Sequence, residues 1–132
     1  MGKPTPGLLS TLLNQAYSTP SREDDVLKKF AEVLQKNSRA IDVPARLGGE
    51  EFALLLPSTG REEAMAVAER LRKQVSEIEM DHPKGMVRIT VSIGAAALCE
   101  GDTTSKTVFN YADSAMYTAK HSGRNQTCWF EI

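Results

Sequence analysis

Two adjacent glycines followed by two carboxylates, Gly48 to Glu51, constrain the fold of this chain more than any other stretch. An apolar run, Phe52 to Leu56, comes directly after them. A Gly-Gly pair between two strand-like segments predicts a two-residue hairpin turn, because glycine reaches positive φ without a steric penalty. The pair also leaves the backbone bare, so that a flat or phosphorylated ligand could approach it closely. Taken alone, the pattern is more often a hairpin with an acidic, solvated tip than a Mg2+ site.

Hydrophobic spacing predicts that helices and strands alternate around this hairpin. The clearest strand runs from Val87 to Leu98, where apolar and polar residues alternate. Thr59 and Glu62 have the spacing of a helix capping box, and residues 81–85 read as a turn. Helices packed on a mostly antiparallel sheet, an α+β sandwich, satisfy this order. We expect helices over residues 8–17, about 21–37, about 60–78 and 105–121, and strands over residues 43–56 on both sides of the hairpin turn, 87–98 and 127–132.

Composition excludes several classes of partner. A chain of 132 residues is one domain with room for a core, and its net charge of −1 creates no field that would attract a nucleic-acid polymer or an anionic membrane. No apolar run approaches the ~20 residues of a membrane span, and the start lacks the apolar core of a signal peptide. Cys99 and Cys128 have no metal-ligand spacing. We expect a cytoplasmic protein with no membrane segment in this chain.

Short motifs on both sides of the hairpin carry a family resemblance. They are Arg39-Ala-Ile-Asp42, Ser92-Ile93-Gly94, Ala112-Asp113, Met116 to Lys120, and Gly123-Arg124-Asn125. In this order and spacing the chain resembles the GGDEF family, the diguanylate cyclase domains, with Gly48 to Phe52 as a Gly-Gly-Glu-Glu-Phe variant of the signature. The resemblance begins near Asp24, so we divide the chain into a non-matching segment, residues 1–20 with a short helix, and a GGDEF domain, residues 21–132. It implies a palm-like fold similar to that of adenylate cyclases and polymerases.

The resemblance also implies an activity. GGDEF domains join two GTP molecules into cyclic di-GMP, and the 3′-hydroxyl of one GTP attacks the α-phosphate of the other. Two domains face each other as an antiparallel homodimer, each holding one GTP, and Mg2+ neutralises the phosphates. The implied ligands are therefore GTP and cyclic di-GMP, and the implied cofactor is Mg2+.

Five positions of the hairpin and the preceding helix match residues that handle the nucleotide and its metal in the family. Glu50 matches the metal-binding carboxylate, with a role in deprotonating the attacking hydroxyl, and Glu51 matches the second acidic position. Both are the catalytic candidates. Gly48 and Gly49 would let the nucleotide lie over the turn. Asp24 matches the aspartate that recognises guanine, although such a residue at a helix start also interacts favourably with the helix dipole.

Two basic residues near the C-terminus match the family's contacts to the triphosphate, Lys120 and Arg124. They are one turn apart at the end of a predicted helix, so both can approach one anion. Cations at this place would also complement the helix dipole. The Gly123-Arg124-Asn125 context favours the phosphate contact.

A second predicted site lies just before the hairpin. Arg39 and Asp42 match the family's Arg-x-x-Asp inhibitory motif, which binds cyclic di-GMP, and Arg70 matches its secondary arginine. An arginine can grip a phosphate or a guanine edge with two hydrogen bonds, and an aspartate can accept from guanine. Without the motif, the same pair would be a surface ion pair.

The first twenty residues depart from the family's pattern. A complete domain begins with a hydrophobic strand that ends in Asp-x-Asp, whose first aspartate is the second Mg2+ carboxylate, and continues with Phe-Lys, Asn-Asp and Gly-His segments. None of these is present here. We therefore expect a truncated domain that lacks the first central strand, with the slot filled by residues 1–20 or a partner chain, or a smaller sheet. The metal site would also lack a carboxylate.

Three functional hypotheses follow. The first is a domain that binds guanine nucleotide, above all cyclic di-GMP, with weak or no cyclase activity, because losing part of the metal's charge stabilisation slows the reaction by roughly a thousandfold or more. The second is a diguanylate cyclase that is active in a longer protein. The third is an interaction module that binds no nucleotide, although such a module has no physical need for this set of charged residues.

Overall fold

The computed structural model describes residues 7–15, 23–48, 50–82, 85–97 and 105–130. Its helices and strands alternate along the chain as the sequence predicts, and the α+β class is confirmed. The helices are α1 (Glu23–Lys36), α2 (Arg61–Ser76) and α3 (Ser105–His121). The strands are β1 (Gly7–Gln15), β2 (Val43–Gly48), β3 (Glu51–Leu56), β4 (Glu79–His82), β5 (Gly85–Ala97) and β6 (Thr127–Trp129).

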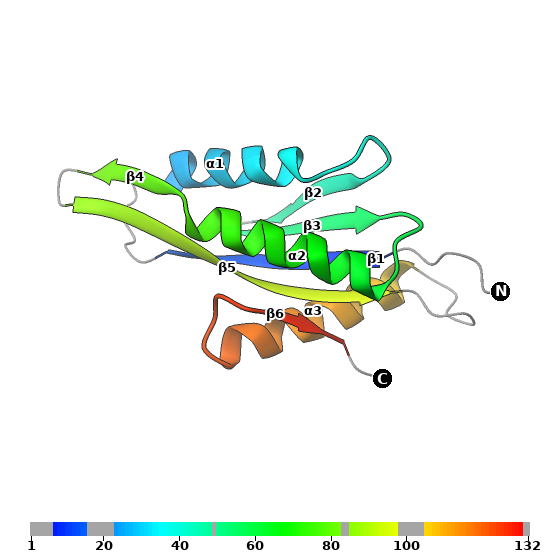
Figure 1. The fold of residues 1–132 in the computed structure, drawn as a ribbon. Helices are drawn as coiled ribbons and strands as arrows, with labels where there is room; N and C mark the ends of the chain where they lie inside the picture. Colours follow the sequence, from blue (N-terminus) through cyan, green and yellow to red (C-terminus); the bar gives the residue numbers. More distant parts are fainter. Residues whose placement is uncertain (1–6, 16–22, 49, 83–84, 98–104, 131–132) are drawn as a thin grey trace.

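The strands form one sheet in the order β2-β3-β1-β5-β4, with β6 pairing β5 (Figure 1). All pairs are antiparallel except the parallel pair of β5 and β6. Helices α1 and α2 cover one face of the sheet and α3 covers the other. β4 pairs with the start of β5 where the sequence predicts only a turn over residues 81–85. The structure therefore has two helical layers around a central sheet.

The first strand corrects two expectations. Residues 8–17 are predicted to form a helix, but Gly7–Gln15 is strand β1. β1 lies between β3 and β5 and pairs with both, so the sheet does not lack a central strand here. Of the expected alternatives, the one in which residues 1–20 fill the slot is confirmed. A short leucine-rich run fits a central strand as well as a helix, and periodicity alone cannot distinguish the two. Without a strand here, β3 and β5 would each leave backbone N–H and C=O groups unpaired inside the sheet, and this favours the strand.

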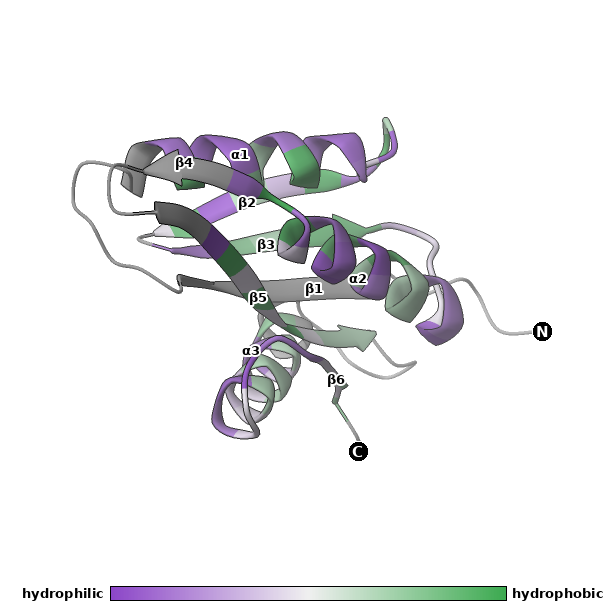
Figure 2. Ribbon diagram, turned by 60° about the vertical axis from the view of Figure 1, so that its left-hand side comes forward, coloured by the Kyte–Doolittle hydropathy of each residue, from purple (hydrophilic) through white to green (hydrophobic). Residues whose placement is uncertain are grey.

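Alternation along β3 divides the core into two parts. Phe52, Leu54 and Leu56 are buried on the side of α1 and α2, and the Phe52 ring lies 4.7 Å from that of Phe30. Ala53 points the other way, toward α3. Each fully buried leucine or phenylalanine contributes about 1.5–3 kcal/mol. Figure 2 shows the apolar β3 and the hydrophilic outer sides of α1 and α2.

Helix α3 approaches β5 very closely at one glycine. A methyl group at Gly94 would overlap backbone atoms of Met116 and Ala112, so only glycine lets the helix approach this closely. This contact fixes the position of α3 along β5. Within the described residues, no helix has both the length and the apolar character that a membrane crossing requires.

Candidate functional site

The hairpin between β2 and β3 carries the predicted catalytic carboxylates. Gly48 is part of β2 and pairs with Glu51, so β2 extends one residue further than the predicted Gly-Gly turn allows. A bulge at Leu47 causes this extension, because the register changes between Arg46 and Gly48. Gly48 has φ +145° and open space around it, as a close-approaching ligand requires. Gly49 lies outside the described residues.

Glu51 belongs to a row of residues that crosses the sheet. It pairs with Leu12 of β1, which pairs in turn with Ser92 of β5. Beside Ser92, the Ile93 amide donates to the Gln126 carbonyl at 3.0 Å. The loop that precedes β6 therefore lies on the same row as the hairpin. Because Phe52 faces α1 and α2, the neighbouring Glu51 faces the α3 side of the sheet.

The end of α3 reaches the same row. The helix joins β5 to the parallel strand β6, so it runs antiparallel to both. Met116 lies on Gly94, and Lys120 follows one turn later, about 6 Å further along the helix. Ser92 is a similar distance from Gly94 along β5. The half-buried Lys120 and the exposed Arg124 thus lie at the hairpin end of the sheet, on the Glu51 side.

Asp24 lies in the first turn of α1, and its side chain is outside the described part of the chain. In Figure 1 the start of α1, the hairpin and the end of α3 lie toward the same end of the molecule. The three segments that carry the predicted nucleotide contacts therefore lie toward one end of the molecule. These segments are far apart in the sequence, so only the family resemblance indicated that they lie near one another.

The carboxylates available for Mg2+ are few. β1 contains no acidic residue, and the residue opposite Glu51 is Leu12. Among the described residues, no group of three or more His, Cys, Asp or Glu side chains could hold a metal ion. Mg2+ is commonly bound by one or two carboxylates together with substrate phosphates and waters. Glu50 and Glu51 therefore fit Mg2+ only as partners of a nucleotide's phosphates.

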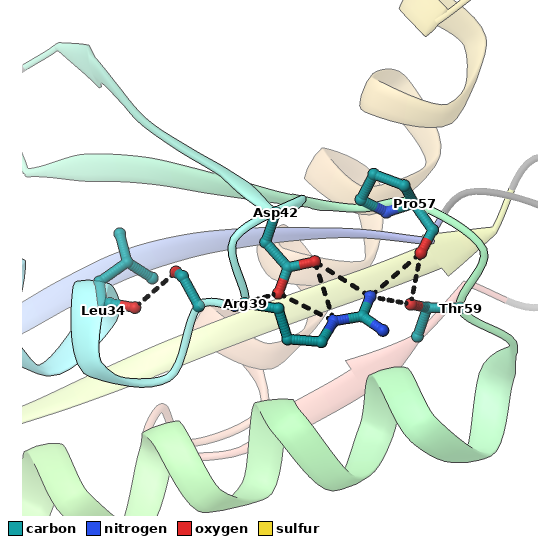
Figure 3. A network of polar contacts seen from close by, with 6 residues as sticks. Leu34, Arg39, Asp42, Pro57 and Thr59 are labelled. Carbon is teal, nitrogen blue, oxygen red and sulfur yellow. Dashed lines mark hydrogen bonds and ion pairs between the residues drawn. The ribbon is translucent and has the colours of Figure 1, made fainter.

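An ion pair at the opposite end of the hairpin strands joins Arg39 and Asp42 (Figure 3). Arg39 Nη2 donates to Asp42 Oδ1 at 3.0 Å, and Nε donates to both carboxylate oxygens at 3.2 and 3.3 Å. The Arg39 amide donates to Asp42 Oδ2 at 2.7 Å. The side-chain hydrogen bonds that Arg39 donates to Asp42 raise the pKa of the Arg39 guanidinium. The Asp42 side chain is 1% exposed and that of Arg39 is 48% exposed.

Thr59 also holds Arg39, and sequence analysis missed this role. Its Oγ1 accepts from Arg39 Nη2 at 2.7 Å and donates to the Pro57 carbonyl at 3.0 Å. The predicted capping box is wrong, because the N-cap of α2 is Gly60 and no side chain caps the helix. The Pro57 carbonyl accepts from Arg39 Nη2 as well, at 3.0 Å. The guanidinium is thus fixed from two sides.

Arg39 and Arg70 meet at one hollow of about 200 Å³. Arg70 reaches it from α2, and its Nε donates to Asn37 Oδ1 at 2.7 Å. Asn37 is buried and also donates to Gln74 Oε1 at 2.7 Å, which ties the end of α1 to α2. The hollow is lined by Arg39, Leu56, Thr59, Glu63, Ala66, Val67 and Arg70. A larger, open depression along α1 contains none of the predicted site residues.

A link between α2 and the loop after α3 was also not predicted. Arg72 Nη1 donates to Asn125 Oδ1 at 3.1 Å, across 53 positions of sequence. Arg72 pairs with Glu69 at 2.9 Å, and the hydrogen bonds between them lower the pKa of Glu69 and raise that of Arg72. The loop contains Arg124, one of the predicted phosphate contacts. A pair of charged residues on a helix gives no sequence signal for such a distant contact.

Comparison with known proteins agrees with this arrangement. The family model of the diguanylate cyclase GGDEF domain matches residues 20–126. The response regulator PleD of Caulobacter vibrioides is 42% identical over 104 residues, which cover 77% of this chain and 23% of that protein. The diguanylate cyclase DgcM of Escherichia coli is 41% identical over 114 residues, covering 86% of this chain and 27% of that protein. The chain spans about a quarter of the length of these curated relatives.

Solved structures show the same fold. The GGDEF domain of DgcB from Caulobacter crescentus, in complex with c-di-GMP, has a TM-score of 0.83 at 27% identity and covers 97% of this chain and 80% of that one. The active GGEEF domain of a diguanylate cyclase from Vibrio cholerae has a TM-score of 0.84 at 25% identity, with coverages of 96% and 84%. With its family model, its sequence relatives and its fold in agreement, the chain belongs to the GGDEF family of diguanylate cyclase domains.

Proposed function

We propose that this GGDEF domain binds guanine nucleotides and recognises cyclic di-GMP at the hollow of Arg39 and Arg70, and that it cyclises GTP weakly or not at all in this form. The observation that carries the proposal is that these two arginines, 31 positions apart in the printed sequence, line one hollow. Cyclic di-GMP offers two phosphodiester anions and two guanine edges. Guanidinium groups recognise both kinds of group with paired hydrogen bonds.

The geometry assigns different roles to Arg39 and Asp42. The carboxylate of Asp42 is buried, and both of its oxygens accept from Arg39. Asp42 therefore orients Arg39, whereas the half-exposed guanidinium contacts the ligand. This differs from the expectation that Asp42 itself accepts from guanine. Arg39 is held in place before binding, so little side-chain entropy is lost when the ligand arrives.

The nucleotide site of this proposal lies at the other end of the sheet. Glu50 and Glu51 lie at the hairpin, and Lys120 and Arg124 lie across the row from them. In this proposal the two basic residues bind the triphosphate and Asp24 recognises guanine. Mg2+, when bound with the nucleotide, would neutralise phosphate charge. Because β1 supplies no second carboxylate, the cation has few protein ligands and cyclisation is slow.

Calorimetric titration of the chain with cyclic di-GMP, with GTP and Mg2+, and with GTP alone tests the proposal. We expect cyclic di-GMP to bind with micromolar or tighter affinity and GTP to bind weakly with little dependence on Mg2+. Arg39→Ala with Asp42→Ala should abolish cyclic di-GMP binding. Arg88→Ala is the matched control, since it also removes an exposed, ion-paired arginine, here paired with Glu79 at 3.3 Å. Equal cyclic di-GMP affinity in the double variant and the control would refute the proposed site.

An active cyclase is the second candidate, and one observation favours it. β1 occupies the central position of the sheet, so β3 and β5 each have it as a partner and the hairpin is supported. Cyclisation would then take two copies in an antiparallel homodimer, each holding one GTP. Production of cyclic di-GMP from GTP and Mg2+ at an enzyme-like rate, above about 1 per second, would replace the weak-cyclase proposal with this one.

A further inference from the structure

The loop between α3 and β6 holds two non-glycine residues in the left-handed backbone region. Gly123 has φ +113°, Arg124 has φ +62° and Asn125 has φ +45°. Glycine adopts such angles freely and asparagine tolerates them, but arginine does not, because its Cβ approaches the neighbouring carbonyl oxygen. Backbone strain of this kind persists only where surrounding contacts hold it. The question is therefore what holds Arg124.

Helix α2 supplies one such contact through Arg72. Its Nη1 donates to Asn125 Oδ1 at 3.1 Å. On its other edge, Nη2 donates to Glu69 Oε2 at 2.9 Å and Nε donates to Glu69 Oε1 at 3.1 Å. Glu69 therefore fixes the plane of the guanidinium, and the guanidinium fixes the residue beside Arg124. From the other side, Gln126 Nε2 donates to the Arg124 carbonyl at 3.2 Å.

We propose that Glu69 and Arg72 are positioning residues, which hold Arg124 where it meets the triphosphate of a bound nucleotide. The proposal rests on nucleotide binding at the end of α3, as proposed above. Arg72 acts through Asn125, with its side chain 25% exposed between α2 and the loop. Arg124 itself is exposed and lies two residues before Gln126, whose carbonyl accepts from the Ile93 amide beside the Glu51 row. A loop fixed in advance avoids the cost of ordering it when the anion binds.

Titration of the whole chain with GTP and Mg2+ tests the proposal. Arg72→Met keeps the length of the side chain but removes both sets of hydrogen bonds, and we expect affinity to fall about tenfold, the loss of one charge-assisted hydrogen bond. Lys73→Met is the matched control, because it makes the same change of charge at the next, exposed position of α2. It should stay within about twofold of the unmodified chain. Arg72→Lys should not restore affinity, since an ammonium lacks the planar fork.

Amide hydrogen exchange without any ligand provides an independent readout. The Arg124 amide donates to the Ala119 carbonyl at 3.0 Å, and it should exchange faster in Arg72→Met but not in Lys73→Met. Cyclic di-GMP affinity should be unchanged in both variants. If the unmodified chain binds no GTP, nucleotide binding is wrong, and exchange alone then decides whether Arg72 holds the loop. Equal exchange and equal GTP affinity in Arg72→Met and Lys73→Met would overturn the positioning role.

Discussion

The two arginines that we assign to ligands are held in opposite ways. The Arg39 side chain donates hydrogen bonds to Asp42, Thr59 and Pro57, and these contacts together fix its position. Arg124 lies on a strained loop that Arg72 of α2 contacts through Asn125, in addition to hydrogen bonds within the loop. The contacts on Arg39 reach its side chain directly, whereas Arg72 acts on Arg124 through a neighbouring residue. The hollow is thus a rigid receptor, and the loop after α3 is the part that substitutions elsewhere can move.

Of the predicted changes, replacing Gly94 with alanine should have the largest effect, and it should affect the Arg124 loop but not the hollow. The added methyl group overlaps the backbone of Met116 and Ala112, so α3 must move away from the sheet and carry the Arg124 loop with it. Overpacking of this kind costs about 3 kcal/mol, which urea denaturation would measure. The hollow lies on the α2 side and should keep its affinity for cyclic di-GMP under conditions where the variant is folded. A loss of cyclic di-GMP affinity as large as that for GTP would contradict the separation of the two sites.

Asp42→Asn is the sharper test of the hollow. The amide has one acceptor oxygen instead of a carboxylate, so Arg39 loses charge-assisted hydrogen bonds but keeps Thr59 and Pro57. We expect cyclic di-GMP affinity to fall about tenfold while GTP affinity is unchanged. Calorimetry with both ligands measures this. If Asp42 instead contacted guanine directly, Arg39→Lys would be tolerated much better than Asp42→Asn; we expect both to weaken binding.

The smallest effect should be a pH dependence at the loop. Hydrogen bonds from Arg72 lower the pKa of Glu69 below its usual value of 4.5. A carboxylate whose pKa is lowered by folding stabilises the folded state above the usual pKa, and this contribution disappears as the pH falls through the lowered pKa. We expect a contribution of about 0.5 kcal/mol at pH 7, because Glu69 is half exposed.

Urea denaturation at pH 7 and at pH 3 measures this contribution. The difference in stability between the unmodified chain and Glu69→Gln should be larger at pH 7, since all other titrating groups are common to both. Glu32→Gln is a suitable control, because Glu32 is paired with Lys29 at 4.0 Å on an exposed face of α1. A Glu69→Gln difference that does not change with pH would show that the Glu69–Arg72 pair does not stabilise the fold.

Local pattern was enough to predict most elements of this fold. The three helices that follow residue 22 and the strands around the hairpin have strong periodicity or turn residues, and the structure contains all of them. β1 was missed because Leu8, Leu9, Leu12 and Leu13 satisfy the helical period by chance. Its strand state depends on pairing with β3 and β5, which is a property of the whole sheet.

The motifs indicated which residues belong to the candidate site, but not how these residues contact one another. The motifs indicated Arg39, Asp42 and Arg70, and the structure brings Arg39 and Arg70 to one hollow. The burial of Asp42 could not be predicted, because an Arg-x-x-Asp pair taken alone is more often a surface ion pair. Thr59 was predicted to cap a helix, so its hydrogen bond with Arg39 was not expected. The link from Arg72 to Asn125 joins segments whose approach only tertiary packing defines.

The central position of β1 also has a consequence for how the chain folds. Its pairing with β5 joins Gly7 to Ala97, whereas the hairpin of β2 and β3 closes between neighbours in sequence. Long-range pairing of this kind slows folding, because a long loop must close before its contacts form. Until β1 inserts, β3 and β5 each present a bare edge to other molecules. During synthesis, β1 leaves the ribosome before β5 and must wait for it, and aggregation competes with folding during this interval.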